Sequence, residues 1–231
     1  MGRLSPYRSI AIGALSFLLL LFAVPAVQAA TVSYNAGFGF PLSPGNQIIN
    51  SLPQWDPALY PGQTLVSVQL DVQADIGANV TAENDSATGG NMGVNLTGIV
   101  NASSTGLSAS AVILQSAGPV AVTATDGNPG TGTDFVDFGL LNGSDSDSDQ
   151  IFAALGPYIG NGNIIANIIG NGGFSVSGVS DSTIQVSNFA ASGLVTVTYE
   201  FVPVPEPASI VLGAFGACGL ALVGWRRRRS K

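Results

Sequence analysis

Between residues 30 and 203 the sequence contains no lysine, arginine, histidine or cysteine. All seven basic residues lie in the terminal segments: Arg3, Arg8, Arg226, Arg227, Arg228, Arg229 and Lys231. Of the 14 acidic residues only Glu206 lies outside this range, so the central segment carries a charge near −13, against −7 for the whole chain.

These absences exclude several classes of function. Without cations the central segment cannot neutralise phosphates, which excludes nucleic-acid binding and polybasic contact with anionic lipid headgroups. Without cysteine there is no disulfide framework, thiol nucleophile or Cys/His metal site. Cys218, the only cysteine, lies in a C-terminal apolar run. It is interpreted as a small apolar helix residue, with acylation as the alternative.

Enzymatic chemistry is restricted in the same way. A hydrolytic triad needs a histidine or an equivalent base beside its nucleophile, and none is present here. A pair of carboxylates, as in glycosidases, is the only catalytic chemistry left. The favoured interpretation of the acids is nevertheless that they are solvated side chains on polar strand faces. The sequence therefore predicts a protein that is not an enzyme, with a carboxylate-pair glycosidase as the remote alternative.

The N-terminal segment 1–29 has the features of a secretory signal peptide. Arg3 and Arg8 precede the apolar run Ile10–Val24, and small residues surround a cleavage site predicted between Ala29 and Ala30. The predicted partner is signal peptidase, and the alternative is an uncleaved anchor.

The C-terminal segment 204–231 combines three features. Val204–Ser209 contains Pro-Glu-Pro, residues 208–225 are apolar, and four arginines follow at once: Arg226, Arg227, Arg228 and Arg229. A helix of these 18 apolar residues would be ~27 Å long, near the lower limit for crossing a bilayer. The positive-inside rule makes the four arginines a membrane stop and places them, and hence the C-terminus, in the cytoplasm.

These three features in this order resemble the PEP-CTERM sorting signal of Gram-negative bacteria. The resemblance implies that an exosortase-type membrane enzyme recognises Pro205, Glu206 and Pro207 and that the chain is released or transferred after brief anchoring by its helix. It also implies association with exopolysaccharide and biofilm matrix, at the cell surface or outside the cell.

The central segment 30–203 is long enough for one domain with its own core. Apolar and polar residues alternate strictly over Leu65–Ile76 and Val195–Phe201, which is typical of strands with one buried face. Shorter predicted strands are Val80–Ala82, Val94–Val100, Ala109–Leu114, Val120–Thr125, Phe174–Val179 and Ile184–Phe189. Many short strands with glycine-rich connections predict an all-β fold, an antiparallel β-sandwich of the Greek-key or jelly-roll kind.

Turns are predicted at Asp126–Gly130 and Asn171–Gly173, and one helical turn within Asp149–Ile159. The order of short motifs, from Asn50–Pro57 through Gly143–Asp149 to Thr196–Phe201, resembles the choice-of-anchor E domain of exported bacterial proteins. That resemblance covers residues 31 to 203 and implies no particular activity.

Two groups of residues are candidate binding sites. Asp145, Asp147 and Asp149 alternate with serines in a predicted loop and could offer hard oxygen ligands to Ca²⁺. An EF-hand is excluded because Gln150 replaces the required glycine, and a flexible acidic loop without metal is the favoured interpretation. No other cofactor is predicted.

Trp55 and Tyr60, beside prolines, could stack on sugar rings, although aromatics closing one end of a sandwich are commoner. The predicted function is that of a structural, surface or matrix protein associated with exopolysaccharide. The alternative is a carbohydrate-binding module or adhesin.

Overall fold

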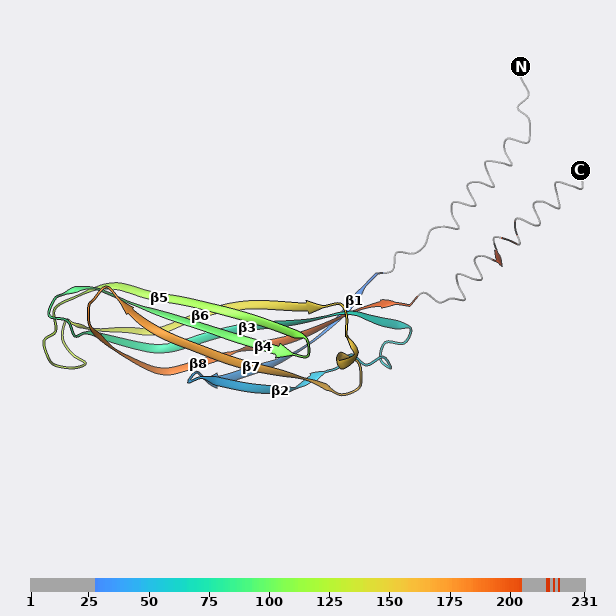
Figure 1. Ribbon diagram of the computed structural model, residues 1–231, viewed down its shortest axis with the longest axis horizontal. Helices are drawn as coiled ribbons and strands as arrows, with labels where there is room; N and C mark the ends of the chain where they lie inside the picture. The colour runs from blue at the N-terminus through green and yellow to red at the C-terminus, as the bar shows by residue number, and fades with distance from the viewer. Residues whose placement is uncertain (1–27, 205–214, 217, 219, 221–231) are drawn as a thin grey trace, which may run out of the picture. The chain divides into compact units, whose positions relative to one another are not determined.

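The computed structural model describes residues 28–204, together with 215, 216, 218 and 220. Residues 28–204 contain eight strands and one short 3-10 helix (Figure 1). The strands form two antiparallel four-stranded sheets packed on one another, which confirms the predicted all-β sandwich. Most of both terminal segments lies outside the described residues.

Sheet A contains, in spatial order, β1 (Ala30–Pro41), β8 (Ser182–Pro203), β3 (Gln63–Asn84) and β6 (Phe135–Ile151). Sheet B contains β2 (Gly45–Pro53), β7 (Asn163–Ser177), β4 (Gly90–Ser104) and β5 (Leu107–Val122). The 3-10 helix η1 (Gly156–Tyr158) connects β6 to β7.

The strand order is that of a jelly roll. The first strand pairs with the eighth, the second with the seventh, the third with the sixth and the fourth with the fifth. Successive pairs alternate between the two sheets, as if one long antiparallel ribbon had been rolled up. Residues distant in sequence, such as Ala30 and Phe201, are therefore partners across one ladder.

Strict alternation along β3 builds sheet A's part of the core. Its inward side chains from Val68 to Val80 are fully buried, whereas Asp75 and Asn79 on the other face are exposed. Ile76 of this row reaches the opposite sheet, because a Cβ on Gly98 of β4 would overlap its Cδ1. Glycine at 98 thus provides the space that lets the two sheets approach.

Polar contacts also join the two sheets. The Tyr199 hydroxyl of β8 donates to the Pro53 carbonyl of β2 (2.8 Å). On the β1–β2 side of the sandwich, the Gly39 N–H donates to Gln47 Oε1 (2.9 Å). A buried hydroxyl with an acceptor costs little, and it fixes the position of the ring.

Several predicted boundaries were wrong. Leu65–Ile76 and Val80–Ala82 are parts of one strand, β3, and Ile184–Phe189 and Val195–Phe201 are parts of β8. Asn171–Gly173 is not a turn but lies inside β7. Its glycines have a low intrinsic preference for strands, and pairing with Thr97–Ile99 of β4 holds them in the sheet. The predicted helical turn within 149–159 is present as η1.

The chain divides into two compact units. The sandwich proper comprises residues 30–61 and 65–201, and of the described residues, 28–29, 62–64 and those from 202 onward belong to the other. In that second unit the Val204 N–H donates to the Gly62 carbonyl (2.8 Å). No helix among the described residues is long and apolar enough to span a bilayer. Of the predicted span 208–225, only residues 215, 216, 218 and 220 are described, and all four are helical.

Candidate functional site

Acidic residues are distributed very unequally between the two sheets. Strands β2, β4, β5 and β7 of sheet B contain no charged residue. Every acid that lies in a strand belongs to sheet A, namely Asp71, Asp75, Glu83, Asp137, Asp145, Asp147, Asp149 and Glu200. Carboxylate sites in this domain therefore lie on sheet A or in the loops.

Asp145, Asp147 and Asp149 form a row, here called the aspartate ladder, along the edge strand β6. Their Oδ2 atoms accept hydrogen bonds from three main-chain N–H groups of β5, at Val112 (2.7 Å), Ser110 (2.7 Å) and Ser108 (2.8 Å) respectively. Each carboxylate thus joins the edge of sheet A to the edge of sheet B.

The spacing of the aspartate ladder follows from strand geometry. In an edge strand only alternate N–H groups point away from the sheet, and side chains also alternate with a period of two. An Asp-Ser-Asp-Ser-Asp run antiparallel to β5 therefore meets three successive outward-pointing donors, at Ser108, Ser110 and Val112. The prediction of a flexible loop here was wrong, because β3 on one side and β5 on the other supply partners for this polar segment.

The aspartate ladder is consequently engaged in structural hydrogen bonds rather than gathered around one point. No three side chains of the His, Cys, Asp or Glu type are grouped to hold one ion within the described residues. Ordered carboxylates that accept main-chain N–H groups at a sheet edge also block the addition of another strand.

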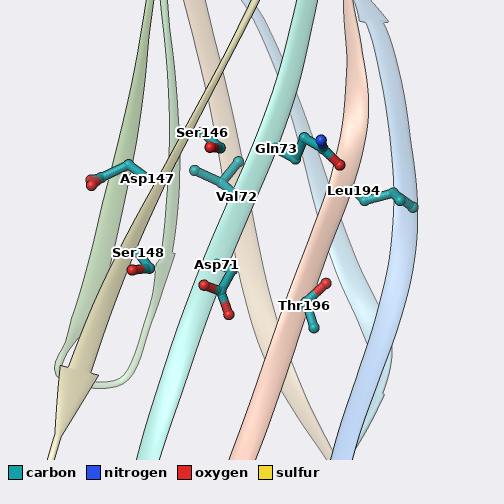
Figure 2. A pocket seen from close by; sticks show the side chains of 8 residues that line it. All are labelled: Asp71, Val72, Gln73, Ser146, Asp147, Ser148, Leu194 and Thr196. Carbon is teal, nitrogen blue, oxygen red and sulfur yellow. The ribbon is translucent and has the colours of Figure 1, made fainter.

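A groove of about 390 Å³ lies beside the aspartate ladder, on sheet A (Figure 2). Eight residues of β3, β6 and β8 line it: Asp71, Val72, Gln73, Ser146, Asp147, Ser148, Leu194 and Thr196. The ladder register places Ser148 opposite Asp71 and Ser146 opposite Gln73, so four polar side chains face the solvent together.

The groove combines hydrogen-bond donors and acceptors with one apolar side. The Asp71 carboxylate is oriented by the Gln69 amide, which donates to its Oδ1 (2.7 Å). Asp147 also borders the groove, but its Oδ2 is bound to β5. Leu194 supplies the apolar surface. Hydroxyl, amide and carboxylate groups around an aliphatic side chain suit a hydroxylated ligand without negative charge, because no cation is available within residues 30–203.

The rings of Trp55 and Tyr60, the predicted candidates for sugar stacking, contact each other mainly inside the domain. Their rings stack at 5.8 Å with an interplanar angle of 8°, and the Phe201 ring lies 4.7 Å from that of Tyr60. Trp55 is only 3% exposed, so its face is covered by protein. The pair closes one end of the core and leaves no open Trp55 face for a sugar.

The predicted processing residues are only partly described. Ala29 is exposed and precedes β1, and Ala30, the first residue of β1, is exposed as well. The predicted sorting motif and membrane stop lie outside the described residues, namely Pro205, Glu206, Pro207, Arg226, Arg227, Arg228 and Arg229. Their roles therefore stay predictions from the sequence.

Comparisons with known proteins bear mainly on the C-terminal segment. The profile of the PEP-CTERM protein-sorting motif matches residues 203–229. This motif supports sorting by an exosortase system and implies export to a cell-surface or extracellular destination. No curated protein matches the chain.

Among solved structures, similarity is weak. Particles derived from infectious bursal virus match with 11% identity and a TM-score of 0.13, covering 88% of this chain and 48% of that one. The infectious bursal disease virus Gx strain matches with 11% identity and a TM-score of 0.12, covering 87% and 49%. The chain thus spans about half the length of these proteins, and at such scores the likeness carries no argument.

Sequence reasoning did not find the groove. Asp71 was interpreted as a solvated acid, and Gln73, Ser146, Leu194 and Thr196 belong to three strands that are far apart in sequence. The alternating pattern of β3 and β8 indicates which of their side chains point outward. The sequence does not indicate that β3, β6 and β8 are neighbours in one sheet.

Proposed function

We propose that this protein is a non-enzymatic, structural component of the cell surface or extracellular matrix, delivered there by an exosortase-type membrane enzyme. The observation that carries the proposal is the union of the sorting motif at 203–229 with a domain that has no histidine, lysine, arginine or cysteine between residues 30 and 203. The only charged side chains of that domain are carboxylates, and the aspartate ladder uses three of them to close the sandwich.

Processing is tested in the host, with and without its exosortase. The mature C-terminus is determined by mass spectrometry on surface and matrix fractions. We expect the mature protein to lack Arg226–Arg229, and the intact tail to persist in membranes when the exosortase is deleted. An intact arginine tail on surface material would contradict the sorting proposal. Deletion of the gene should weaken the matrix, and an unaltered matrix would contradict the structural role.

A second candidate function, binding of a neutral polysaccharide, is favoured by the groove on sheet A. Four solvent-facing polar side chains on the adjacent strands β3 and β6, with Thr196 of the neighbouring β8, give a rigid set of hydrogen-bond partners for sugar hydroxyls. An anionic polysaccharide is disfavoured, because Asp71 would repel it and nothing nearby carries positive charge.

The groove is tested by retention of the protein on host exopolysaccharide. We expect Asp71→Ala and Gln73→Ala to lose retention, whereas Thr97→Ala, on the outer face of sheet B, keeps it. Retention that survives both groove substitutions would reject this site. Trp55→Ala is unsuitable as a test, because the removal of a buried ring destabilises the domain by about 3–5 kcal/mol whether or not it contacts a ligand. Hydrolysis of the same polysaccharide would instead support the glycosidase alternative.

A further inference from the structure

The loop between β5 and β6 brings two carboxylates together against a glycine. A Cβ on Gly132 would lie 2.5 Å from Asp126 Oδ2 and 2.7 Å from Asp134 Oδ1. Both oxygens therefore border one small space, which exists because residue 132 has no side chain and adopts a φ of +94°.

The other oxygen of each carboxylate is already engaged. Asp134 Oδ2 accepts the Asp126 N–H (2.8 Å), and Asp126 Oδ1 accepts the Asn128 N–H (2.7 Å). The Asp134 side chain is fully buried, and its Oδ1 has no hydrogen-bond partner. A buried carboxylate oxygen without a partner is costly unless something binds it.

Nothing in the sandwich can supply a positive charge to this oxygen, since residues 30–203 include no lysine, arginine or histidine. A further acid approaches the same loop: Glu83 Oε2 accepts the Gly130 N–H (2.8 Å), and Glu83 is 7% exposed. Three acids thus approach one glycine-rich loop with no protein cation to balance them.

The loop is also held in place from several sides. The Asn84 N–H donates to the Asp134 carbonyl (2.9 Å), and Thr123 donates its N–H to the Thr133 carbonyl (3.2 Å). The buried Asn84 amide adds a bond to the Thr123 carbonyl (2.6 Å). The two carboxylates are therefore fixed by the ends of β3 and β5 rather than carried on a free loop.

We propose that Asp126 Oδ2 and Asp134 Oδ1 bind a hard divalent cation, Ca²⁺, beside Gly132. Carboxylate oxygens are the preferred ligands of Ca²⁺, which takes six to eight oxygens and accepts main-chain carbonyls and water for the remainder. With two carboxylates and an open side the site fits the weak extracellular class, with Kd of roughly 10⁻⁴–10⁻³ M. It is separate from the aspartate ladder, whose Oδ2 atoms are bound to β5.

The test uses purified full-length protein, treated with EDTA and titrated with CaCl₂ at constant ionic strength. We expect one Ca²⁺ per chain by calorimetry and a rise in Tm of roughly 5–10 °C at a hundred times Kd, with a smaller response to MgCl₂. Asp126→Asn and Asp134→Asn should each weaken binding at least about tenfold, because loss of even an outer-shell partner of a metal site costs roughly 10- to 100-fold in affinity.

Two controls keep the result interpretable. Asp75→Asn and Asp137→Asn remove equal charge from exposed positions of sheet A, away from this loop site, and should bind Ca²⁺ as the wild type does. In EDTA, Asp134→Asn should melt no lower than the wild type, because it removes a buried charge. If that variant fails to fold, Asp126→Asn, whose side chain is exposed, decides. Absence of binding up to about 10 mM, ten times the upper Kd of this class, would overturn the proposal. Binding unchanged in Asp126→Asn, or lost only in Asp75→Asn, would overturn it as well.

Discussion

Sheets A and B have the same number of strands and share one core, but their outer surfaces differ in chemistry. Sheet A carries eight acidic residues, whereas sheet B carries none and exposes aliphatic side chains such as Ile48, Leu114 and Ile165. Apart from the aspartate ladder, whose carboxylates bond to β5, this asymmetry contributes little to folding, because the interior is apolar on both sides. It concerns what each face can meet outside the cell: sheet A repels anions and offers polar contacts, and sheet B is neutral.

The largest expected effect on the free energy of unfolding comes from the shared core, compared with the outer face of a sheet. Ile76→Ala, in the buried row of β3, should lower the free energy of unfolding by about 3 kcal/mol through lost packing and a cavity next to Gly98. Ile48→Ala, on the outer face of sheet B, should change it by less than about 0.5 kcal/mol. Urea unfolding measures both, and similar losses would show that the core is not where the structure places it.

The next effect tests the junction between the sheets. Replacement of Asp145, Asp147 and Asp149 together by alanine should cost about 2–3 kcal/mol, since each of three charge-assisted hydrogen bonds to β5 is lost at a partly solvated edge. The freed N–H row of β5 should also promote self-association, seen by light scattering. Asp75→Ala, which removes an exposed charge from the same sheet, should do neither. Equal behaviour of Asp75→Ala would refute a structural role for the aspartate ladder.

Alkaline pH tests the tyrosine that links the sheets. Burial raises the pKa of Tyr199 above its ordinary value of 10, with further contributions from Tyr158 and Tyr34, and burial likewise raises the pKa of Tyr158. Both phenols therefore ionise at a higher pH in the folded state than in the unfolded chain. Their contribution to stability is complete below pH 10, and above it the free energy of unfolding should fall by up to about 1.4 kcal/mol per pH unit for each.

The slope of stability against pH above about pH 10, where an unfolded tyrosine ionises, is the measurement. Tyr199→Phe should make this slope shallower, whatever it does to stability at neutral pH. An identical slope in this variant would show that the Tyr199 hydroxyl is solvated and does not hold Pro53.

The smallest effect on stability concerns sheet B alone. Leu114→Asp should leave the unfolding free energy within about 0.5 kcal/mol, because Leu114 is 71% exposed, but should reduce attraction between molecules at high concentration. Gln73→Glu adds the same charge to sheet A and should change little there. The second virial coefficient measures this attraction. An equal rise in both variants would show that the attraction between molecules does not come from the uncharged outer face of sheet B.

The sequence was sufficient for the class of fold but not for its edges. Strict alternation over Leu65–Ile76 revealed β3, since a half-buried strand requires it. No strand was predicted for β1, β2 or β6, because their glycine, asparagine, aspartate and serine residues disfavour strands in isolation. Pairing supplies what propensity lacks: the polar half of β6 is stabilised by β3 on one side and by the N–H groups of β5 on the other.

The candidate sites were less accessible to sequence reasoning than the fold. Acidic density pointed to Asp145–Asp149, yet the buried carboxylate oxygen without a hydrogen-bond partner, among the described residues, belongs to Asp134, whose only sequence signal was a glycine-rich turn nearby. Burial of one carboxylate depends on how the ends of β3, β5 and β6 meet, and local pattern does not contain that information. The groove was missed for the same reason.

The position of β8 in sheet A determines how late in the chain the sheet can be completed. It is the eighth strand along the chain, yet it lies inside sheet A between β1 and β3. A chain that crosses a membrane N-terminus first delivers this strand last, so the sheet cannot be completed until the residues just before the sorting motif have emerged. Until β8 is available, the edges of β1 and β3 that pair with it have no hydrogen-bond partners in the sheet. The domain therefore acquires its final form only when the residues next to the 203–229 motif are available, so completion of sheet A is tied to the last part of the chain.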